Sequence, residues 1–156
     1  MATVPTLATI LANIKTQIEA VSSIGNVLDR PRDAVSPEDF DTLFIDTTSG
    51  TVRCWIIDIG TSDALEDVAG NLFVTTRTVS VEGFLAFNQT DNSQSTFQAL
   101  VDAVQSKING NSNIFGTYPL FADTGTSIQV DFATLGNVLC HHASIQFLVE
   151  STEVVS

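Results

Sequence analysis

The most constraining feature of this 156-residue chain is a regular alternation of side chains close to its end. Between residues 138 and 150, one set of alternate positions holds Leu139, His141, Ala143, Ile145, Phe147 and Val149, and the other holds Cys140, His142, Ser144, Gln146, Leu148 and Glu150. A period of two is typical of a β-strand that buries one of its faces. We therefore predict a strand over 138–150, followed by a polar tail at 151–156.

Comparable patterns predict the other strands. They lie at 26–29, 51–59, 73–87 and 128–132. The segment 51–59 is mostly apolar on both faces, which is typical of a strand that is covered on two sides. Gly83 interrupts the longest of these strands and indicates a β-bulge. The polar segment 60–72 and the long segment 110–126 are predicted to be loops, and a turn is expected near Gly136.

Two segments carry apolar side chains at steps of three and four, the spacing of an amphipathic helix. The first, at 5–22, places Leu7, Ile10, Leu11, Ile14, Ile18 and Val21 on one stripe, and the second, at 93–108, does the same with Phe97, Leu100, Val101, Val104 and Ile108. Pro5 suits the first position of its helix. Between them, the acidic connector 30–50 has a helix-start signal at Ser36 and Pro37. We expect it to form one short helical turn, anchored by Phe40, Leu43 and Phe44.

The order of these elements is α-β-β-β-α-β-β, which predicts an α+β fold: a mainly antiparallel sheet with two helices packed on it. The length fits a single domain over 1–156. A chain of this size buries roughly 68–70% of its unfolded surface, so it can fold without disulfides or a metal ion.

The charge balance excludes several classes of function. Eighteen acidic side chains and six lysines and arginines give a formal net charge of −12, and no lysine or arginine follows Lys107. Such a surface neither neutralises phosphates nor adheres to an anionic membrane. The start of the chain lacks the charged and apolar regions of a signal peptide, and no apolar run is long enough to span a membrane. We expect synthesis in a cytoplasm.

Two short motifs resemble chemical sites. Cys140-His141-His142 combines metal-ligating residue types, but only Cys140 and His142 share a face of a strand, and the sequence offers no second Cys/His pair. The run Asp123-Thr124-Gly125-Thr126 resembles the active-site turn of aspartic proteases, which requires two close carboxylates. Here only 30 residues follow Thr126, so a glycine-containing turn is the better interpretation.

The remaining candidates are weaker. The acids Glu38, Asp39 and Asp41, and likewise Glu66 and Asp67, lack the spacing of an EF-hand loop. The two cysteines, Cys54 and Cys140, are interpreted as small buried apolar residues rather than nucleophiles. No phosphate loop, dinucleotide fingerprint or hydrolase elbow is present. The sequence therefore predicts no catalytic, cofactor-binding or metal-binding residue, and no enzyme.

The apolar content points to a partner. The mean hydropathy is +0.24 with only 15% charged residues, which is high for a small domain with a wholly solvated surface. Candidates for contact with a partner are Trp55, Phe84, Ile114, Phe115, Tyr118, Leu120 and Phe121, the last five from the 112–122 region. Ordinary core packing is the alternative interpretation for these side chains.

The order of elements and the closing strand together resemble the tail terminator proteins of long-tailed bacteriophages, also called tail completion or neck proteins. The resemblance covers about residues 5–150. It rests on LATILANI at 7–14, VL at 27–28, RTVSVEGF at 77–84, TFQALV at 96–101 and LCHHASIQFLVE at 139–150. The loop 110–126 and the connector 30–50 have no counterpart in it.

The resemblance implies a structural protein of the virion tail and neck, made in the bacterial host cytoplasm. A homohexameric ring would cap the last ring of the tail tube, end tail polymerisation and join the tail to a head-completion, or stopper, protein. DNA would pass through its lumen without sequence-specific binding, and an acidic wall would repel it within about 8 Å at physiological salt. Another tail or neck protein, such as a tail-tube or head-completion protein, and a small bacterial binding module remain alternatives.

Overall fold

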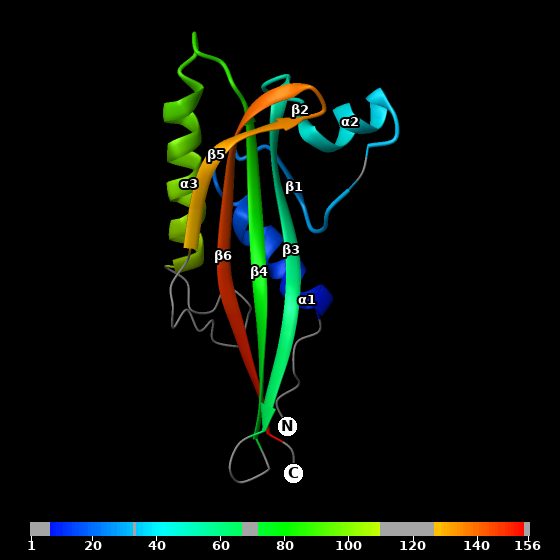
Figure 1. Ribbon diagram of the computed structural model, residues 1–156, viewed down its shortest axis with the longest axis vertical. Coiled ribbons are helices and arrows are strands. Elements are labelled where there is room, and N and C mark those ends of the chain that lie inside the picture. The colour runs from blue at the N-terminus through cyan, green and yellow to red at the C-terminus, as the bar shows by residue number, and fades with distance from the viewer. Residues whose placement is uncertain (1–6, 33, 67–71, 110–126, 155–156) are drawn as a thin grey trace.

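The computed structural model describes residues 7–32, 34–66, 72–109 and 127–154. The elements follow in the order α1 (Leu7–Glu19), β1 (Asn26–Leu28), α2 (Pro37–Phe44), β2 (Ile45–Asp46), β3 (Thr51–Glu66), β4 (Leu72–Ala86), α3 (Ser93–Asn109), β5 (Ser127–Leu135) and β6 (Val138–Val154). Figure 1 shows the three long strands β3, β4 and β6 side by side along the length of the molecule. The predicted α+β class is confirmed.

The strands form one mixed sheet in the order β1-β3-β4-β6-β5, and β2 pairs with the start of β3. Every pairing is antiparallel except that of β1 with β3. Pairing of β3 with β4 continues to Glu66 and Phe73, and that of β4 with β6 continues to Leu72 and Val154. Much of the sheet is therefore a three-stranded antiparallel ribbon.

This ribbon corrects two sequence predictions. The predicted loop 60–72 is mostly strand, because β3 runs to Glu66 and β4 begins at Leu72. The predicted tail 151–156 belongs to β6 as far as Val154. Backbone ladders form between polar segments as readily as between apolar ones, since the N–H and C=O groups supply the bonds. A prediction from side-chain polarity alone therefore assigned these two strand ends to a loop and a tail.

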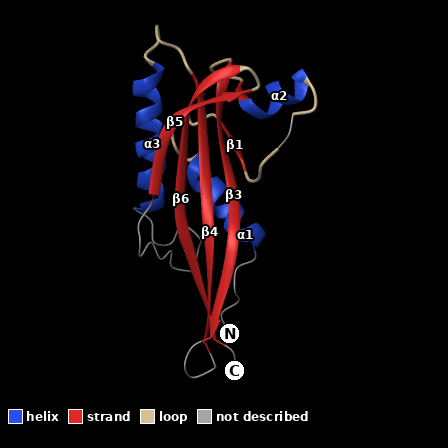
Figure 2. Cartoon of the chain, viewed as in Figure 1, coloured by secondary structure: helices blue, strands red, loops and turns tan. Residues whose placement is uncertain are grey.

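The helices α1 and α3 cover one face of the sheet, which we call the first face (Figure 2). The main core, a cluster of twenty buried residues, lies between these helices and the sheet. It collects the predicted helix stripes (Ile10, Ile14, Ile18, Phe97, Val101, Val104 and Ile108) and alternate strand positions (Trp55, Ile57, Val79, Val81, Ala143, Ile145 and Phe147). The predicted faces of both helices and of the closing strand are confirmed. The first helix ends at Glu19, earlier than the predicted 22, and Pro5 lies outside the described residues.

The opposite side of the sheet, the second face, is covered near one end by α2. This helix was predicted only as a short turn, but it runs for eight residues and is a third helix of the fold. The Ser36 side chain caps it by accepting a hydrogen bond from the Asp39 backbone N–H at 3.1 Å. The anchors expected from the sequence are confirmed, since Phe40, Leu43 and Phe44 join a second, smaller cluster with Val52, Cys54 and Cys140.

The predicted bulge at Gly83 is wrong. Gly83 pairs in regular register with Trp55, and the irregularity of the β3–β4 ladder lies between Ile59 and Ser62 instead. A glycine occurs here because a Cβ at this position would lie 2.6 Å from the Trp55 ring. The indole lies against the bare backbone of Gly83 and stacks on Phe97 at 6.1 Å between ring centroids.

Candidate functional site

Beyond α2, no described helix covers the second face of the sheet (Figure 1). Three successive rungs across β3, β4, β6 and β5 on this face are Cys54–Phe84–His142–Asp131, Ile56–Glu82–Ser144–Gln129 and Asp58–Ser80–Gln146–Ser127. The rungs become more polar with distance from α2. They carry three carboxylates and neither lysine nor arginine, because the strand arginines Arg53 and Arg77 lie at alternate positions that belong to the first face.

His142 links two of these carboxylates. Its Nδ1 lies 2.6 Å from Oδ1 of Asp131 on β5, and its Nε2 lies 3.3 Å from Oε1 of Glu82 on β4. The imidazole also contacts the Phe84 ring at 4.8 Å between centroids. His142 stands on β6, so its ring bridges the two acids from the strand that lies between theirs.

Both thiols are buried, which confirms the interpretation of Cys54 and Cys140 as small apolar residues. Burial raises the pKa of Cys54 to about 12, and the nearby Cys140 contributes to the same shift. Burial also raises the pKa of Cys140. Since the thiolate is the reactive form, neither side chain is poised to act as a nucleophile. As predicted, Cys140 and His142 share one face and His141 lies on the other.

His141 forms a buried hydrogen-bond network that the sequence pattern did not predict. Its Nε2 lies 2.8 Å from Oγ of Ser93, the first residue of α3, and the same Oγ accepts the Asn88 backbone N–H at 2.8 Å. Burial lowers the pKa of His141, which favours its neutral form. The rings of Phe87, Phe97 and Phe132 surround the imidazole.

A serine hydroxyl bonded to a histidine resembles a nucleophile and its base, but a catalytic arrangement also orients the base with a third polar group. Among the described residues, the second nitrogen of His141 has no such partner in the network, and aromatic rings lie around it. The arrangement instead ties the N-terminus of α3 and the 88–92 turn to the closing strand. The sequence feature that could have indicated this arrangement is His141, a polar residue on an otherwise apolar face of the strand.

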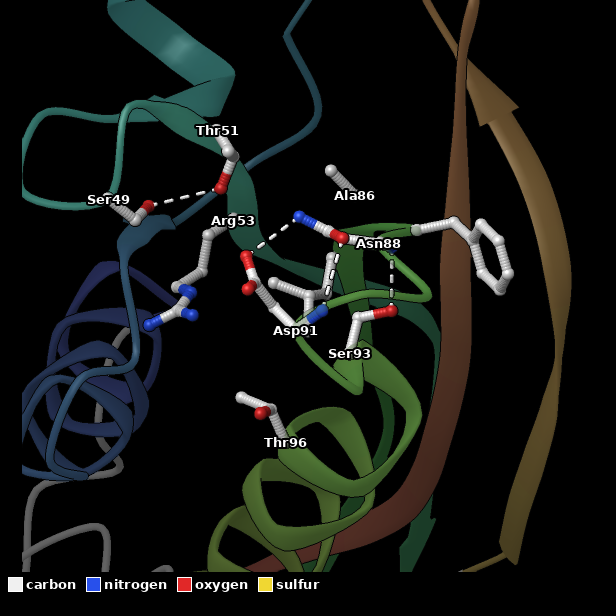
Figure 3. A pocket seen from close by; sticks show the side chains of 10 residues that line it. Ser49, Thr51, Arg53, Ala86, Asn88, Asp91, Ser93 and Thr96 are labelled. Carbon is white, nitrogen blue, oxygen red and sulfur yellow. Dashed lines mark hydrogen bonds between the residues drawn. The ribbon is translucent and has the colours of Figure 1, made fainter.

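Two neighbouring hollows share Arg53 and Thr96. The first, of about 210 Å³, is lined mainly by polar residues of β3, the 88–92 turn and the start of α3. The second, of about 440 Å³, lies between α3 and the segment after α1. In Figure 3 the Asp91 carboxylate turns toward the Asn88 amide, to which it is bonded at 2.8 Å. Arg53 donates to the Ser23 carbonyl at 3.1 Å. No set of groups converges in either hollow as a reaction would require.

Of the apolar candidates for partner contact, Trp55 belongs to the core, as the alternative interpretation had it. Only 1% of its surface is exposed, because it fills the core between Gly83 and Phe97. Phe84 is half-buried in contact with His142. The five candidates Ile114, Phe115, Tyr118, Leu120 and Phe121 lie outside the described residues. Instead, the exposed large apolar side chains of the described chain are Val35, Phe87, Val130, Phe132 and Leu139.

The acidic motifs have ordinary explanations where the structure describes them. Glu38 and Asp39 occupy the first turn of α2, where negative charge is favoured. Asp67 and the run at 123–126 lie outside the described residues. Within the described residues, no three His, Cys, Asp or Glu side chains are grouped so that they could hold a metal ion.

No protein-family model and no curated protein matches this chain. No helix in the described part of the chain is both long and apolar enough to cross a membrane.

Proposed function

We propose that this chain is a structural protein of a bacteriophage tail, of the tail terminator kind. Copies of it assemble as a homohexameric ring that caps the tail tube, ends its polymerisation and joins the tail to the neck. DNA passes through the ring without being held. The ring contacts a tail-tube protein on one side and a head-completion protein on the other.

The observation that carries this proposal is the second face of the sheet. Its rungs present hydroxyls, amides and the three acids Asp58, Glu82 and Asp131, with no lysine or arginine among them. A wall that conducts DNA must not release counterions from phosphates, since that release is what binds DNA to basic surfaces. A face that is built on long strands and carries acids but no lysine or arginine meets this requirement. We assign it to the lumen.

The charge of the whole chain supports the same role. With a net charge of −12 per chain, the assembled ring is strongly acidic. Such a surface slows the approach of a polyanion within about one Debye length, roughly 8 Å at physiological salt. The resemblance of residues 5–150 to tail terminators is the basis for proposing the ring and its position on the tube.

Negative-stain electron microscopy of the purified protein tests the ring directly. We expect closed rings, alone or on the ends of tail tubes, and tubes of limited length when the protein is added during their polymerisation. Addition that leaves tube length unchanged, with no ring on tube ends, would refute the terminator role. A ring that stacks into tubes by itself would instead indicate a tail-tube protein.

A charge experiment tests the lumen assignment separately. Ser80→Lys with Gln146→Lys places two cations on one rung of the second face, and we expect these rings to retain DNA at low salt. The matched control is Ser95→Lys with Gln98→Lys, at exposed positions of α3 on the other side of the molecule. Equal DNA retention by both pairs would contradict the assignment of the second face to the lumen.

A further inference from the structure

The side chain of Arg53 is a half-buried cation without an acidic partner. Among the described residues, no carboxylate lies within ion-pair distance of its guanidinium, although the chain has eighteen acids. The one hydrogen bond of the side chain within these residues is the donation from Nη1 to the Ser23 carbonyl, and its Nε is enclosed without a partner. A half-buried charge without a counter-charge is unfavourable. This cation is therefore available to an anion from outside the chain.

The fold holds Arg53 in place. Gly25 has a positive φ of 89°, and a Cβ there would lie 2.5 Å from Cγ of Arg53, so the chain crosses directly over the arginine stem. Asp46, on the neighbouring strand β2, accepts a hydrogen bond from the Ser49 N–H at 3.1 Å and lies beyond ion-pair distance of Arg53. The guanidinium is thus positioned before any ligand arrives, which reduces the entropy lost on binding.

Arg53 lies where the two hollows meet. It lines both the first hollow, of about 210 Å³, and the second, of about 440 Å³, and so does Thr96. Figure 3 shows these two side chains at the first hollow, Arg53 from β3 and Thr96 from α3. The second hollow alone falls within the roughly 300–1,000 Å³ that is typical of small-ligand sites. Together the hollows can hold a small molecule whose charged end reaches Arg53.

The lining selects one class of anion. Of the described residues that line either hollow, Arg53 is the only cation and Asp91 the only acid, so the lining compensates at most one negative charge. A net charge of −12 disfavours a more highly charged anion such as phosphate. The second hollow adds the apolar side chains Ala99 and Ala103 of α3, together with Val21. Because a guanidinium pairs bidentately with a carboxylate, a monocarboxylate with an apolar stem suits this lining.

We propose that the two hollows form one binding site for a short aliphatic monocarboxylate. Its carboxylate pairs with the Arg53 guanidinium and accepts a hydrogen bond from the Thr96 hydroxyl, and its stem lies along Ala99 and Ala103. This site does not depend on the proposed ring, because every residue that forms it belongs to one chain. It lies on the first face of the sheet, opposite to the face that we assign to the lumen.

An NMR titration of the ¹⁵N-labelled protein with butyrate, acetate and phosphate, at constant ionic strength and neutral pH, tests this site. We expect saturable shifts of the Ser23, Ser95 and Thr96 amides and of the Arg53 Nε–H. Butyrate should bind at least about fivefold more tightly than acetate, since each fully buried methylene adds roughly fourfold and the open hollow buries the two extra methylenes in part. Phosphate should bind more weakly than butyrate.

Three variants separate the charged end of the site from its apolar part. Arg53→Gln keeps an N–H donor but removes the charge, and should weaken butyrate binding at least about tenfold. Arg30→Gln is the matched control, because this arginine is exposed and lines neither hollow, and it should leave binding unchanged. Ala99→Leu, at an exposed position of α3, occupies the space for the stem and should weaken butyrate binding while leaving acetate binding unchanged.

Shifts that grow without saturation would overturn the site, and so would equal butyrate affinity in the wild type and Arg53→Gln. Equal affinity for acetate and butyrate, or a preference for phosphate, would refute the assigned class of ligand. If Arg53→Gln does not fold, the comparison of Ala99→Leu with the wild type decides, because unchanged butyrate binding in that variant contradicts the proposed position of the stem. All of these measurements are made on single chains, so their failure would leave the proposed ring untouched.

Discussion

Replacing Gly83 with alanine tests the packing of the core most directly, because the clash can be located in the structure. The new Cβ would lie 2.6–2.8 Å from three carbon atoms of the Trp55 ring. The ring cannot move away freely, since it is 1% exposed and stacks on Phe97. Overpacking of this kind costs about 1–3 kcal/mol of unfolding free energy. For a domain of this size, that lowers the melting temperature by about 2–4 °C for each kcal/mol lost.

The same substitution in a protein that lacks the Trp55 ring tests whether the clash with this ring causes the loss of stability. In a Trp55→Leu protein the ring is absent, so Gly83→Ala meets space and gains the roughly 0.5–1 kcal/mol by which alanine exceeds glycine inside a strand. We therefore expect Gly83→Ala to destabilise the wild type and to be neutral or stabilising in Trp55→Leu. Urea unfolding followed by far-UV circular dichroism measures all four proteins, because Trp55 is the only tryptophan and fluorescence would be lost with it. Equal destabilisation in both backgrounds would refute the reasoning.

Three further outcomes follow from the buried polar groups. Ser93→Ala leaves Nε2 of the buried His141 without its serine partner and should lower the unfolding free energy by about 1–3 kcal/mol in urea melts, whereas the exposed Ser95→Ala should change it little. Because burial lowers the pKa of His141, its contribution to stability is complete above the ordinary value of about 6.5 and is lost as the pH falls through the folded-state value. Wild type should therefore lose more stability on acidification than His141→Gln, measured in the same melts. Cys54, with its pKa raised to about 12, should react with a disulfide reagent at mildly alkaline pH only after urea unfolds the protein.

The sequence predicted those elements in which regularly spaced apolar residues are the buried ones. Both long helices and the first face of β6 follow the expected stripes, because alternate residues such as Ile145 and Phe147 pack against the helices. The end of β3 and the last residues of β6 were missed for the opposite reason. Their polar composition resembles a loop, and only the partner strand reveals that the backbone is paired.

Gly83 and Ser93 show a second kind of limit. A glycine in a strand indicates either a bulge or a close neighbour, and the sequence does not say that Trp55 lies across from it. Ser93 reads as an ordinary helix-start residue, yet its hydroxyl is bonded to a histidine 48 residues later. Both facts depend on strand register, which the pattern of one strand does not fix. The same holds for the bridging of Asp131 and Glu82 by His142.

The division of the sheet into two faces explains how one chain can be both strongly acidic and well packed. The first face supplies the main core, so its positions are confined to apolar side chains of defined size. Away from α2, the second face supports no helix of the described part of the chain, and its acids keep access to water: Glu82 and Asp131 are 44% and 49% exposed at the side chain. Carboxylates in such positions ionise without the desolvation penalty of a buried charge. The His142 ring lies between these two acids, on the strand that separates theirs. Charge on this face can therefore change without any change in the core, which makes its lack of basic side chains informative about function rather than about folding.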